Sequence, residues 1–243
     1  MLPLIGVTCA WSPETHLCNV ARDFYYIDVG YSKAIFKAGG IPVLMAPPQA
    51  DEVDLEAYAD EMLKKVDALY FSGGAGGGKC KLTGEKLPLY EQQPVRSAWE
   101  ECLLKKAYEL DIPVLGACRG HQMITVALGG SLDGDFYPPH RQDEPYYEGH
   151  HTVKIAEGSL LGKLAGTDDW FVNSIHTQKV DVAPPGFIVS AWTEDGSVEA
   201  VESTEKTFFL GTQFHPELMI YDERAKNVLK AFVEAAVEYS KKK

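Results

Sequence analysis

Residues 114–122 read V-L-G-A-C-R-G-H-Q, and this stretch decides the fold of the chain. The apolar run before Cys118 is typical of a buried strand and the run after it of a helix, so the backbone should turn sharply at the cysteine. Such a turn brings two backbone segments together and requires small residues on either side, here Gly116 and Gly120. The thiol should project at the carboxyl end of a sheet, where the positive end of a helix favours a thiolate. Cys118 is therefore a candidate nucleophile, with a structural cysteine as the alternative.

Strand-like and helical runs alternate around this turn. The expected strands are 4–8, 41–46, 66–71 and 112–115, and the expected helices are 22–37, 51–64, 94–110 and 120–128. This order predicts an α/β protein in which helices cover both faces of a mostly parallel central sheet, in three α/β/α layers. Short β-rich pieces follow Ser131, at 151–155, 170–173, 187–191, 198–202 and 208–214, before a closing helix at 222–240. We expect these pieces to form a small addition and the whole chain, 1–243, to form a single domain.

The composition limits the possible functions. With 45% hydrophobic residues the 243-residue chain can bury a core, and its net charge of −12 makes nucleic acid and anionic membranes poor partners. No apolar run reaches the ~20 residues of a membrane span, and the first ten residues lack the basic start of a signal peptide. Five cysteines without CxxC spacing predict neither disulfides nor a zinc site. We therefore expect free thiols and a cytoplasmic location.

A second segment can supply the base that a thiol nucleophile needs. Residues 209–217 read F-L-G-T-Q-F-H-P-E, which places His215 at the end of an apolar strand. Glu217 stands two residues further on and can reach back to the imidazole, while Pro216 between them stiffens the chain. Taken alone, an H-P-E sequence is more often a surface turn, so this segment gains its meaning only together with Cys118.

The glycine-rich segment 71–80, F-S-G-G-A-G-G-G-K-C, differs by one residue from a phosphate-binding P-loop. We reject a nucleotide site, because Cys80 cannot replace the metal-binding hydroxyl of the motif. Residues 81–88 also contain Gly84 and Pro88 and would form a poor helix, whereas phosphate binding needs a helix N-terminus. The loop up to Tyr90 could instead act as a mobile lid.

The pair G-A-C-R-G-H-Q at 116–122 and G-T-Q-F-H-P-E at 211–217 resembles class I glutamine amidotransferase domains. Segments 5–8, 38–43, 172–178 and 195–202 resemble the branch of autonomous γ-glutamyl hydrolases, and the similarity spans essentially the whole chain. The resemblance implies the flavodoxin-like fold of that family. The chain departs from the family pattern at Ser72, where proline is usual, and in the A-G-G-G run at 75–78, which puts the geometry of this loop in question.

The resemblance also implies a site. It assigns Cys118 as nucleophile, His215 as acid and base, Glu217 as its orienter, the N–H groups of Gly74 and Arg119 as the oxyanion hole, and Gln122 and His176 as substrate contacts. It implies no metal and no cofactor. The implied reaction is hydrolysis of γ-glutamyl amides, such as γ-glutamyl-γ-aminobutyrate, through a thioester on Cys118, with release of glutamate and an amine. The expected partner is this small molecule, and a homodimer would be compatible with it.

Two other functions stay open on the same fold. The chain could be a glutaminase subunit that supplies ammonia to a separate synthetase, or a binding protein without catalysis. Among the remaining candidates, His151 is expected to be a structural group at a strand start, since no carboxylate or further histidine stands at metal-ligand spacing. Arg96 is expected to anchor the structure. The tyrosine pairs 25–26 and 146–147 could line a cleft, but packing in the core or at its rim is the favoured interpretation.

Overall fold

The computed structural model describes residues 2–12, 24–49, 53–74, 88–133 and 140–243. Residues 75–87, which make up most of the expected lid and the segment that resembles a P-loop beyond Gly74, lie outside these residues, as does Cys18. Cys80 is among residues 75–87.

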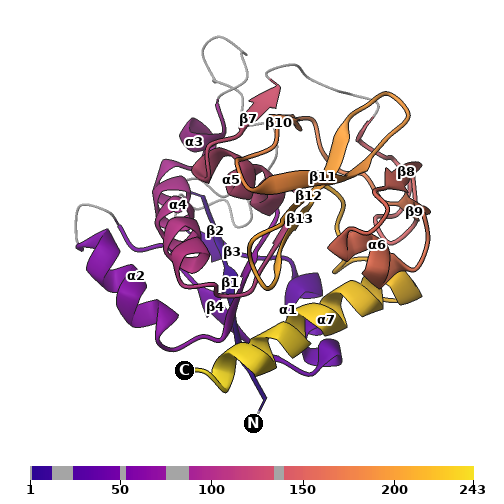
Figure 1. Cartoon of the computed structure of the whole chain (residues 1–243). Helices are drawn as coiled ribbons and strands as arrows, with labels where there is room; N and C mark the ends of the chain where they lie inside the picture. The colour runs from indigo at the N-terminus through magenta and orange to yellow at the C-terminus, as the bar shows by residue number, and fades with distance from the viewer. Residues whose placement is uncertain (1, 13–23, 50–52, 75–87, 134–139) are drawn as a thin grey trace.

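Five parallel strands form the centre of the sheet (Figure 1). Their order across the sheet is β4 (Ile41–Met45), β1 (Leu4–Thr8), β5 (Ala68–Phe71), β6 (Val114–Ala117) and β13 (Phe209–Thr212). Counted along the chain, these parallel strands have the order 2-1-3-4-5, which is the flavodoxin-like order. The α/β class and the parallel sheet predicted from the sequence are confirmed.

The β-rich part of the chain extends this sheet with antiparallel strands. Beyond β13 follow β12 (Val198–Ser203), β11 (Phe187–Trp192), β8 (His151–Ile155) and β9 (Asp169–Val172), and β10 (Lys179–Val182) pairs with both β12 and β7 (Ser131–Asp133). A separate two-stranded sheet contains β2 (Ala10–Ser12) and β3 (Phe24–Tyr26). The expected addition is therefore continuous with the central sheet.

Helices cover both faces of the sheet. One face carries α1 (Val29–Ala38), α6 (Leu160–Ala165) and α7 (Glu223–Ser240), and the other carries α2 (Leu55–Leu63), α3 (Leu89–Gln92), α4 (Pro94–Glu109) and α5 (Arg119–Ala127) (Figure 1). None of the helices in the described part of the chain combines the length and hydropathy needed to cross a membrane.

The start of α1 differs from the helix expected at 22–37. The aromatic residues of β3, Phe24–Tyr26, pair with β2 instead of entering the helix. Asp28 then caps α1, since its carboxylate accepts a hydrogen bond of 2.6 Å from the N–H of Gly30. At the other end Gly39 adopts φ 93°, the left-handed conformation that commonly ends helices. The β preference of the aromatic run outweighed the helical pattern there.

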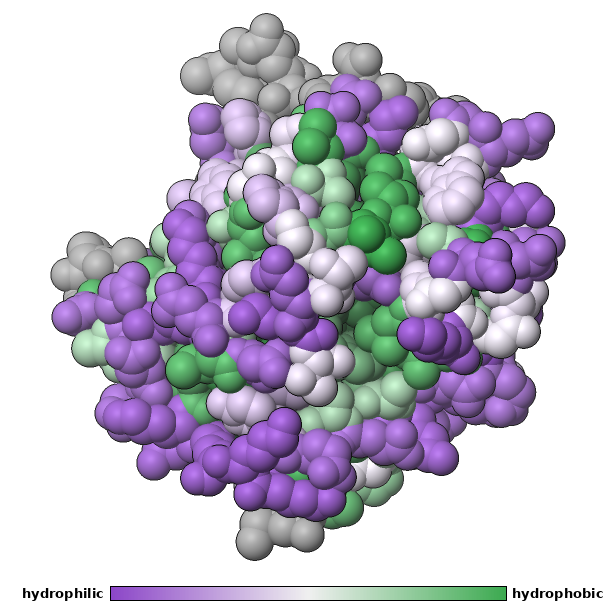
Figure 2. Space-filling view, viewed as in Figure 1, coloured by the Kyte–Doolittle hydropathy of each residue, from purple (hydrophilic) through white to green (hydrophobic). Residues whose placement is uncertain are grey.

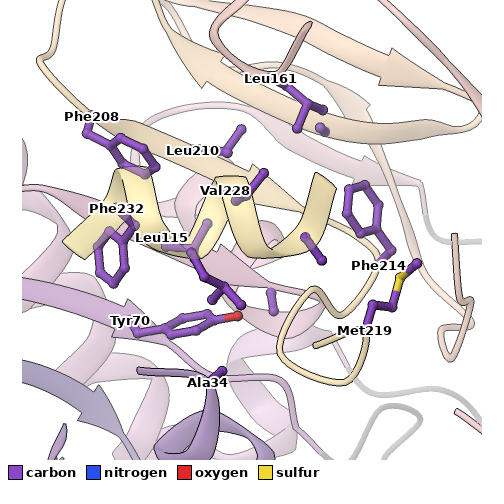
Figure 3. Close-up of a cluster of buried hydrophobic side chains, with 14 of the residues drawn as sticks. Ala34, Tyr70, Leu115, Leu161, Phe208, Leu210, Phe214, Met219, Val228 and Phe232 are labelled. Atoms are coloured by element: carbon purple, nitrogen blue, oxygen red, sulfur yellow. The ribbon is translucent and has the colours of Figure 1, made fainter. Parts of the chain in front are cut away.

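A hydrophobic core fills each space between sheet and helices. Under α7, Tyr70 and Leu115 from the strands meet Phe232 from the helix (Figure 3). Figure 3 also shows the Tyr70 hydroxyl directed toward the segment that carries Met219. The second core, under α4 and α5, contains the fully buried Trp99. Each large side chain buried in this way contributes about 1.5–3 kcal/mol to stability. The outer surface seen in Figure 2 is mostly hydrophilic, with smaller apolar areas between the charged groups.

The first turn of α5 lies directly against two strands. A Cβ atom on Gly120 would lie only 2.1 Å from the carbonyl oxygen of Phe71 at the end of β5. A Cβ atom on Gly116 would lie 2.7 Å from the backbone carbon of Gly120. Real Cβ atoms essentially never approach backbone so closely, so this junction requires glycine at both positions.

We predict that Gly120→Ala lowers the free energy of unfolding by on the order of 3 kcal/mol, because α5 must move away from β5. Gly39→Ala is the matched control: nothing lies within 4 Å of the added Cβ, so only its left-handed backbone is strained, at a cost of about 1 kcal/mol. Urea denaturation of both variants measures the difference. Equal losses would show that the junction is not the tight contact described.

Candidate active site

Cys118 occupies a strained turn between β6 and α5. It is the residue before the first turn of α5 and has φ 52° and ψ −103°, a conformation that costs energy for any residue with a side chain. Its N–H donates a hydrogen bond of 2.8 Å to the carbonyl of Thr212, which holds the turn next to the end of β13. The side chain is buried. Strain of this kind is typical of functional positions, and here it fixes the direction of the thiol.

His215 and Glu217 form a buried pair beside this turn. The Nδ1 atom of His215 lies 2.6 Å from Oε1 of Glu217, and the Tyr70 hydroxyl donates to Oε2 of Glu217 at 2.8 Å. Burial alone would lower the pKa of His215, but attraction to Glu217 and side-chain hydrogen bonds to Cys118 and Glu217 outweigh it and hold this pKa well above its ordinary value. Because the Nδ1 atom of His215 is hydrogen-bonded to Glu217, the Nε2 atom of His215 is the one available to the Cys118 thiol. The structure thus brings together the three residues expected from the sequence.

Asn173 holds the backbone of His215 from both sides. The N–H of His215 donates to Oδ1 of Asn173 at 2.8 Å, and Nδ2 of Asn173 donates to the carbonyl of His215 at 3.1 Å. The same Nδ2 also donates to the carbonyl of Tyr146 at 2.8 Å. Asn173 follows β9 and is fully buried. The sequence contains Asn173 in a segment that resembles the family, but nothing in that segment indicates a partner 42 residues away.

Arg96 determines how the Gly73-Gly74 loop lies. Its Nη2 donates to the carbonyl of Ser72 at 2.7 Å and to that of Gly73 at 2.9 Å. On the opposite side of the same loop, the N–H of Gly73 donates to the Tyr31 hydroxyl at 2.7 Å. The C=O and N–H of a trans peptide point in opposite directions, so the N–H of Gly74 is turned away from Arg96. Arg96 is an anchor, as expected, and its target is this loop.

Ser72 and the two glycines fit the loop into a narrow space. The Ser72 hydroxyl donates to the carbonyl of Thr8 at 2.6 Å, a bond that proline could not make. A Cβ on Gly73 would lie 2.7 Å from Cε1 of His215, and one on Gly74 would lie 2.6 Å from Cδ of Arg119. The two residues expected to supply the oxyanion hole, Gly74 and Arg119, therefore belong to segments in contact.

A buried carboxylate holds two arginines in place. Oε1 of Glu100 accepts from Nε of Arg96 at 2.7 Å and from the Thr8 hydroxyl at 2.6 Å, and Oε2 pairs with Nη1 of Arg119. Burial would raise the pKa of Glu100, but the charges of Arg119 and Arg96 lower it. Burial lowers the pKa of Arg119 to about 10, although the attraction of Glu100 partly opposes this effect. Arg119 therefore stays charged at neutral pH. The network links α4, α5 and the glycine loop. The sequence analysis did not identify Glu100 as the carboxylate that binds both arginines.

Gln122 and His176, the expected substrate contacts, line one narrow pocket with Cys118. Nε2 of Gln122 donates to the carbonyl of Gln178 and to Oε1 of Gln213, both at 3.1 Å, so its carbonyl oxygen is the atom left for a ligand. In His176, Nδ1 lies 3.0 Å from the carbonyl of Gln178 and Nε2 lies 3.3 Å from Glu199. Both ring nitrogens of His176 thus face the protein, and its polar contact with substrate stays a prediction.

A second histidine close to the thiol is not a competing base. His121, three residues after Cys118, is fully buried within α5. Burial lowers the pKa of His121 to about 3, and the nearby Glu199 carboxylate only partly opposes this effect. His121 is therefore neutral at neutral pH and buried in the protein, which leaves His215 as the candidate base beside the thiol.

A larger cavity opens on the other side of His215. Among the residues that line it are Tyr26, Asp28, Gly74, Tyr146 and Ile175. All four tyrosines of the pairs 25–26 and 146–147 are exposed, so none of them packs in the core, and Tyr26 and Tyr146 line this cavity.

His151 begins β8, as expected, but it has partners that the sequence analysis did not find. His140, His176 and Glu199 come from separate segments and lie around it. No carboxylate or further histidine stands near His151 at the sequence spacing expected of metal ligands, but the fold brings such residues close to it.

We predict that Glu217→Gln lowers the pKa of His215, because burial then acts without the opposing carboxylate. NMR titration of the His215 ring measures this. The folded pKa of His215 lies above its ordinary 6.5 and that of Glu217 below its ordinary 4.5. The stabilisation by this pair is therefore complete between the two ordinary pKa values, 4.5 and 6.5. It is lost as pH rises through the raised pKa of His215 or falls through the lowered pKa of Glu217. Tyr70→Phe keeps the charge and should give a smaller shift. An unchanged titration in the Gln variant would contradict the pairing.

We predict that Glu100→Gln lowers the free energy of unfolding by about 3–5 kcal/mol at neutral pH, because two buried guanidinium groups lose their carboxylate. The folded pKa of Glu100 is lowered, so the advantage of the wild type is complete above the ordinary pKa of 4.5 and shrinks as pH falls below it. Urea denaturation at neutral and acidic pH tests this. Glu101→Gln, which breaks an exposed pair with Lys105, is the control and should cost at most about 1 kcal/mol. A loss that does not depend on pH would contradict the account.

Comparisons with known proteins show what this chain is similar to. The Peptidase C26 profile matches residues 3–217. A gamma-glutamyl-gamma-aminobutyrate hydrolase of Escherichia coli strain K12 is 33% identical over 227 residues, covering 88% of this chain and 85% of that protein. Protein NtpR of Enterococcus hirae is 31% identical and covers 90% and 92%. The glutaminase domain of Trypanosoma brucei CTPS superimposes with a TM-score of 0.63 at 18% identity, covering 97% and 94%, which is a likeness of fold alone.

Proposed function

Because this chain belongs to the Peptidase C26 family, we propose that it is a cysteine-dependent hydrolase of γ-glutamyl amide bonds. The observation that carries the proposal is the buried arrangement in which His215 contacts both Cys118 and Glu217. The activity in the name of the relative from Escherichia coli supports a substrate similar to γ-glutamyl-γ-aminobutyrate. We further propose that the protein acts alone on this small molecule, as one domain and in the cytoplasm.

The proposed reaction has two steps. The Cys118 thiolate attacks the γ-carbonyl carbon, and the His215 imidazolium gives its proton to the leaving amine as the C–N bond breaks. A water molecule then loses a proton to neutral His215 while its oxygen attacks the thioester, which releases glutamate and restores the thiolate. Glu217 holds Nδ1 throughout and favours the imidazolium that the first step consumes. The raised pKa of His215 supports this role as proton donor.

The oxyanion of each tetrahedral intermediate needs donors near Cys118. We assign the N–H of Arg119, at the free N-terminal end of α5, and the N–H of Gly74, which is turned away from Arg96. Each such donor is worth about 3 kcal/mol in comparable acyl-transfer sites. Under this proposal Arg96 and Glu100 are positioning residues, because they orient the loop without touching the substrate.

The narrow pocket at Cys118 and the larger cavity at His215 suggest where the two halves of the substrate bind. We assign the side of Cys118 that carries Gln122 to the glutamyl group, since the Gln122 oxygen can accept a hydrogen bond from an ammonium. The narrow pocket at this position must widen when the glutamyl group binds. The larger cavity, lined by Tyr26 and Tyr146, is then left for the leaving amine. Its described lining contains the acidic Asp28 and no lysine or arginine. The charge of the leaving group is therefore the property to vary in a test.

We predict that the purified chain alone releases glutamate from γ-glutamyl amides. The panel contains glutamine, γ-glutamyl-γ-aminobutyrate, a γ-glutamyl peptide, a folate polyglutamate and a γ-glutamyl diamine with a cationic leaving group. Cys118→Ala should reduce turnover by at least about a thousandfold, because it removes the nucleophile. Cys102→Ala is the matched control, since Cys102 lies in α4 with its sulfur near the carbonyl of Leu55, and it should leave turnover unchanged.

The same panel separates the alternatives. Glutaminase activity that appears only when a synthetase partner is added would replace our proposal with an ammonia-supplying subunit. Binding of γ-glutamyl compounds without turnover would replace it with a binding protein. Turnover that survives Cys118→Ala would contradict the proposed nucleophile.

A further inference from the structure

We propose that His140, His151 and Glu199 bind a divalent transition-metal ion such as Zn²⁺, with His176 as the nearest candidate for a fourth ligand. One possible ligand atom from each of the first three residues lies within 4.8 Å of the other two. The imidazole atoms that face Glu199 Oε1 are His140 Nδ1 and His151 Nε2. The proposal does not depend on the proposed hydrolase activity.

The distances around Glu199 fit metal coordination better than hydrogen bonding. Its Oε1 lies 3.7 Å from His140 Nδ1, 3.6 Å from His151 Nε2 and 3.3 Å from His176 Nε2. A hydrogen bond from N–H to oxygen is about 2.7–3.2 Å long. Ligand atoms about 2.0–2.2 Å from a tetrahedral Zn²⁺ lie roughly 3.3–3.6 Å from each other. Three nitrogens at such distances from one carboxylate oxygen therefore leave space for a cation among them.

Several polar atoms of Glu199, His151 and His176 are buried without hydrogen bonds. Within the described residues, both oxygens of Glu199, Nε2 of His151 and Nε2 of His176 have no hydrogen-bond partner. Glu199 is fully buried and His176 nearly so. A buried carboxylate is costly unless it is paired or coordinates a metal. A divalent cation would satisfy Glu199 and accept the lone pairs of the imidazoles together.

The far sides of two imidazoles have the partners that metal-bound histidines usually have. His140 Nε2 lies 3.1 Å from Oδ2 of Asp195, and His176 Nδ1 lies 3.0 Å from the carbonyl of Gln178. A carboxylate or backbone carbonyl on the outer nitrogen fixes the tautomer and turns the other nitrogen to the metal. In both residues the nitrogen turned inward is the one that faces Glu199. Two imidazoles and one carboxylate are a donor set that Zn²⁺ uses in proteins.

The site would connect segments that are far apart in the sequence. His151 begins β8 and Glu199 lies on β12, both in the antiparallel part of the sheet (Figure 1), while His140 and His176 flank the bridge between Arg141 and Ile175. His176 also lines the pocket that contains Cys118. A metal ion at this position would hold the wall of that pocket in place without contacting the thiol.

The test measures Zn²⁺ binding by the full chain. After treatment with a chelator, Zn²⁺ alone is titrated against a competing dye, and thermal unfolding is recorded with and without it. We expect one Zn²⁺ per chain and a raised Tm, since a ligand that binds only the folded state stabilises it. Substituted Co²⁺ should give the visible absorption of tetrahedral coordination.

His151→Gln is the first variant, because its partly exposed side chain makes a folded product the expected outcome. It should weaken Zn²⁺ binding by more than about tenfold and reduce the shift in Tm accordingly. His150→Gln is the matched control: His150 is the adjacent histidine, its Nδ1 lies 3.3 Å from Glu144, and the variant should bind Zn²⁺ like the wild type. Glu199→Gln repeats the test at the central ligand. Absence of stoichiometric binding, or equal binding by the wild type and His151→Gln, would overturn the proposal.

Discussion

The contact between the first turn of α5 and the end of β5 is the constraint on which the rest of the site depends. Gly120 lies so close to the carbonyl of Phe71 that no side chain fits between them. This contact forces the strained conformation of Cys118 and places it beside the loop that begins at Ser72. Since β13 pairs with β6 in parallel, the same junction brings the end of β13, and with it His215, to the thiol. The stability of the packed sheet thus maintains a local strain at Cys118.

Two buried charge systems then set the orientation of the groups around Cys118. On one side Glu100 binds both Arg96 and Arg119. Arg96 in turn orients the glycine loop by donating hydrogen bonds to the carbonyl groups of Ser72 and Gly73. On the other side Glu217 holds the imidazolium of His215 and receives a bond from Tyr70. Buried charges of this kind are stable only when every partner is present, which makes both systems sensitive to the loss of one residue. Electrostatic preorganisation, with no need for movement, is what an acyl-transfer site requires.

The sequence allowed prediction of features that depend on local pattern. Alternating strands and helices predicted the parallel sheet, and the glycines at 116 and 120 predicted the sharp turn, because each needs only neighbours along the chain. Partners from distant segments escaped prediction, as with Asn173 on the backbone of His215 and the cluster around Glu199. No spacing rule links such residues, since only the fold makes them neighbours. The predicted start of the first helix was wrong because Phe24–Tyr26 pairs with β2, and no local pattern reveals this pairing.

The central claim is that Cys118 carries the acyl group between the two steps. The most direct measurement is mass spectrometry of the protein after rapid acid quenching during turnover of a γ-glutamyl amide. The account predicts one glutamyl group per chain on the peptide that contains Cys118, sensitive to hydroxylamine as a thioester should be. Turnover without an adduct on any cysteine, or an adduct on a different residue, would contradict it.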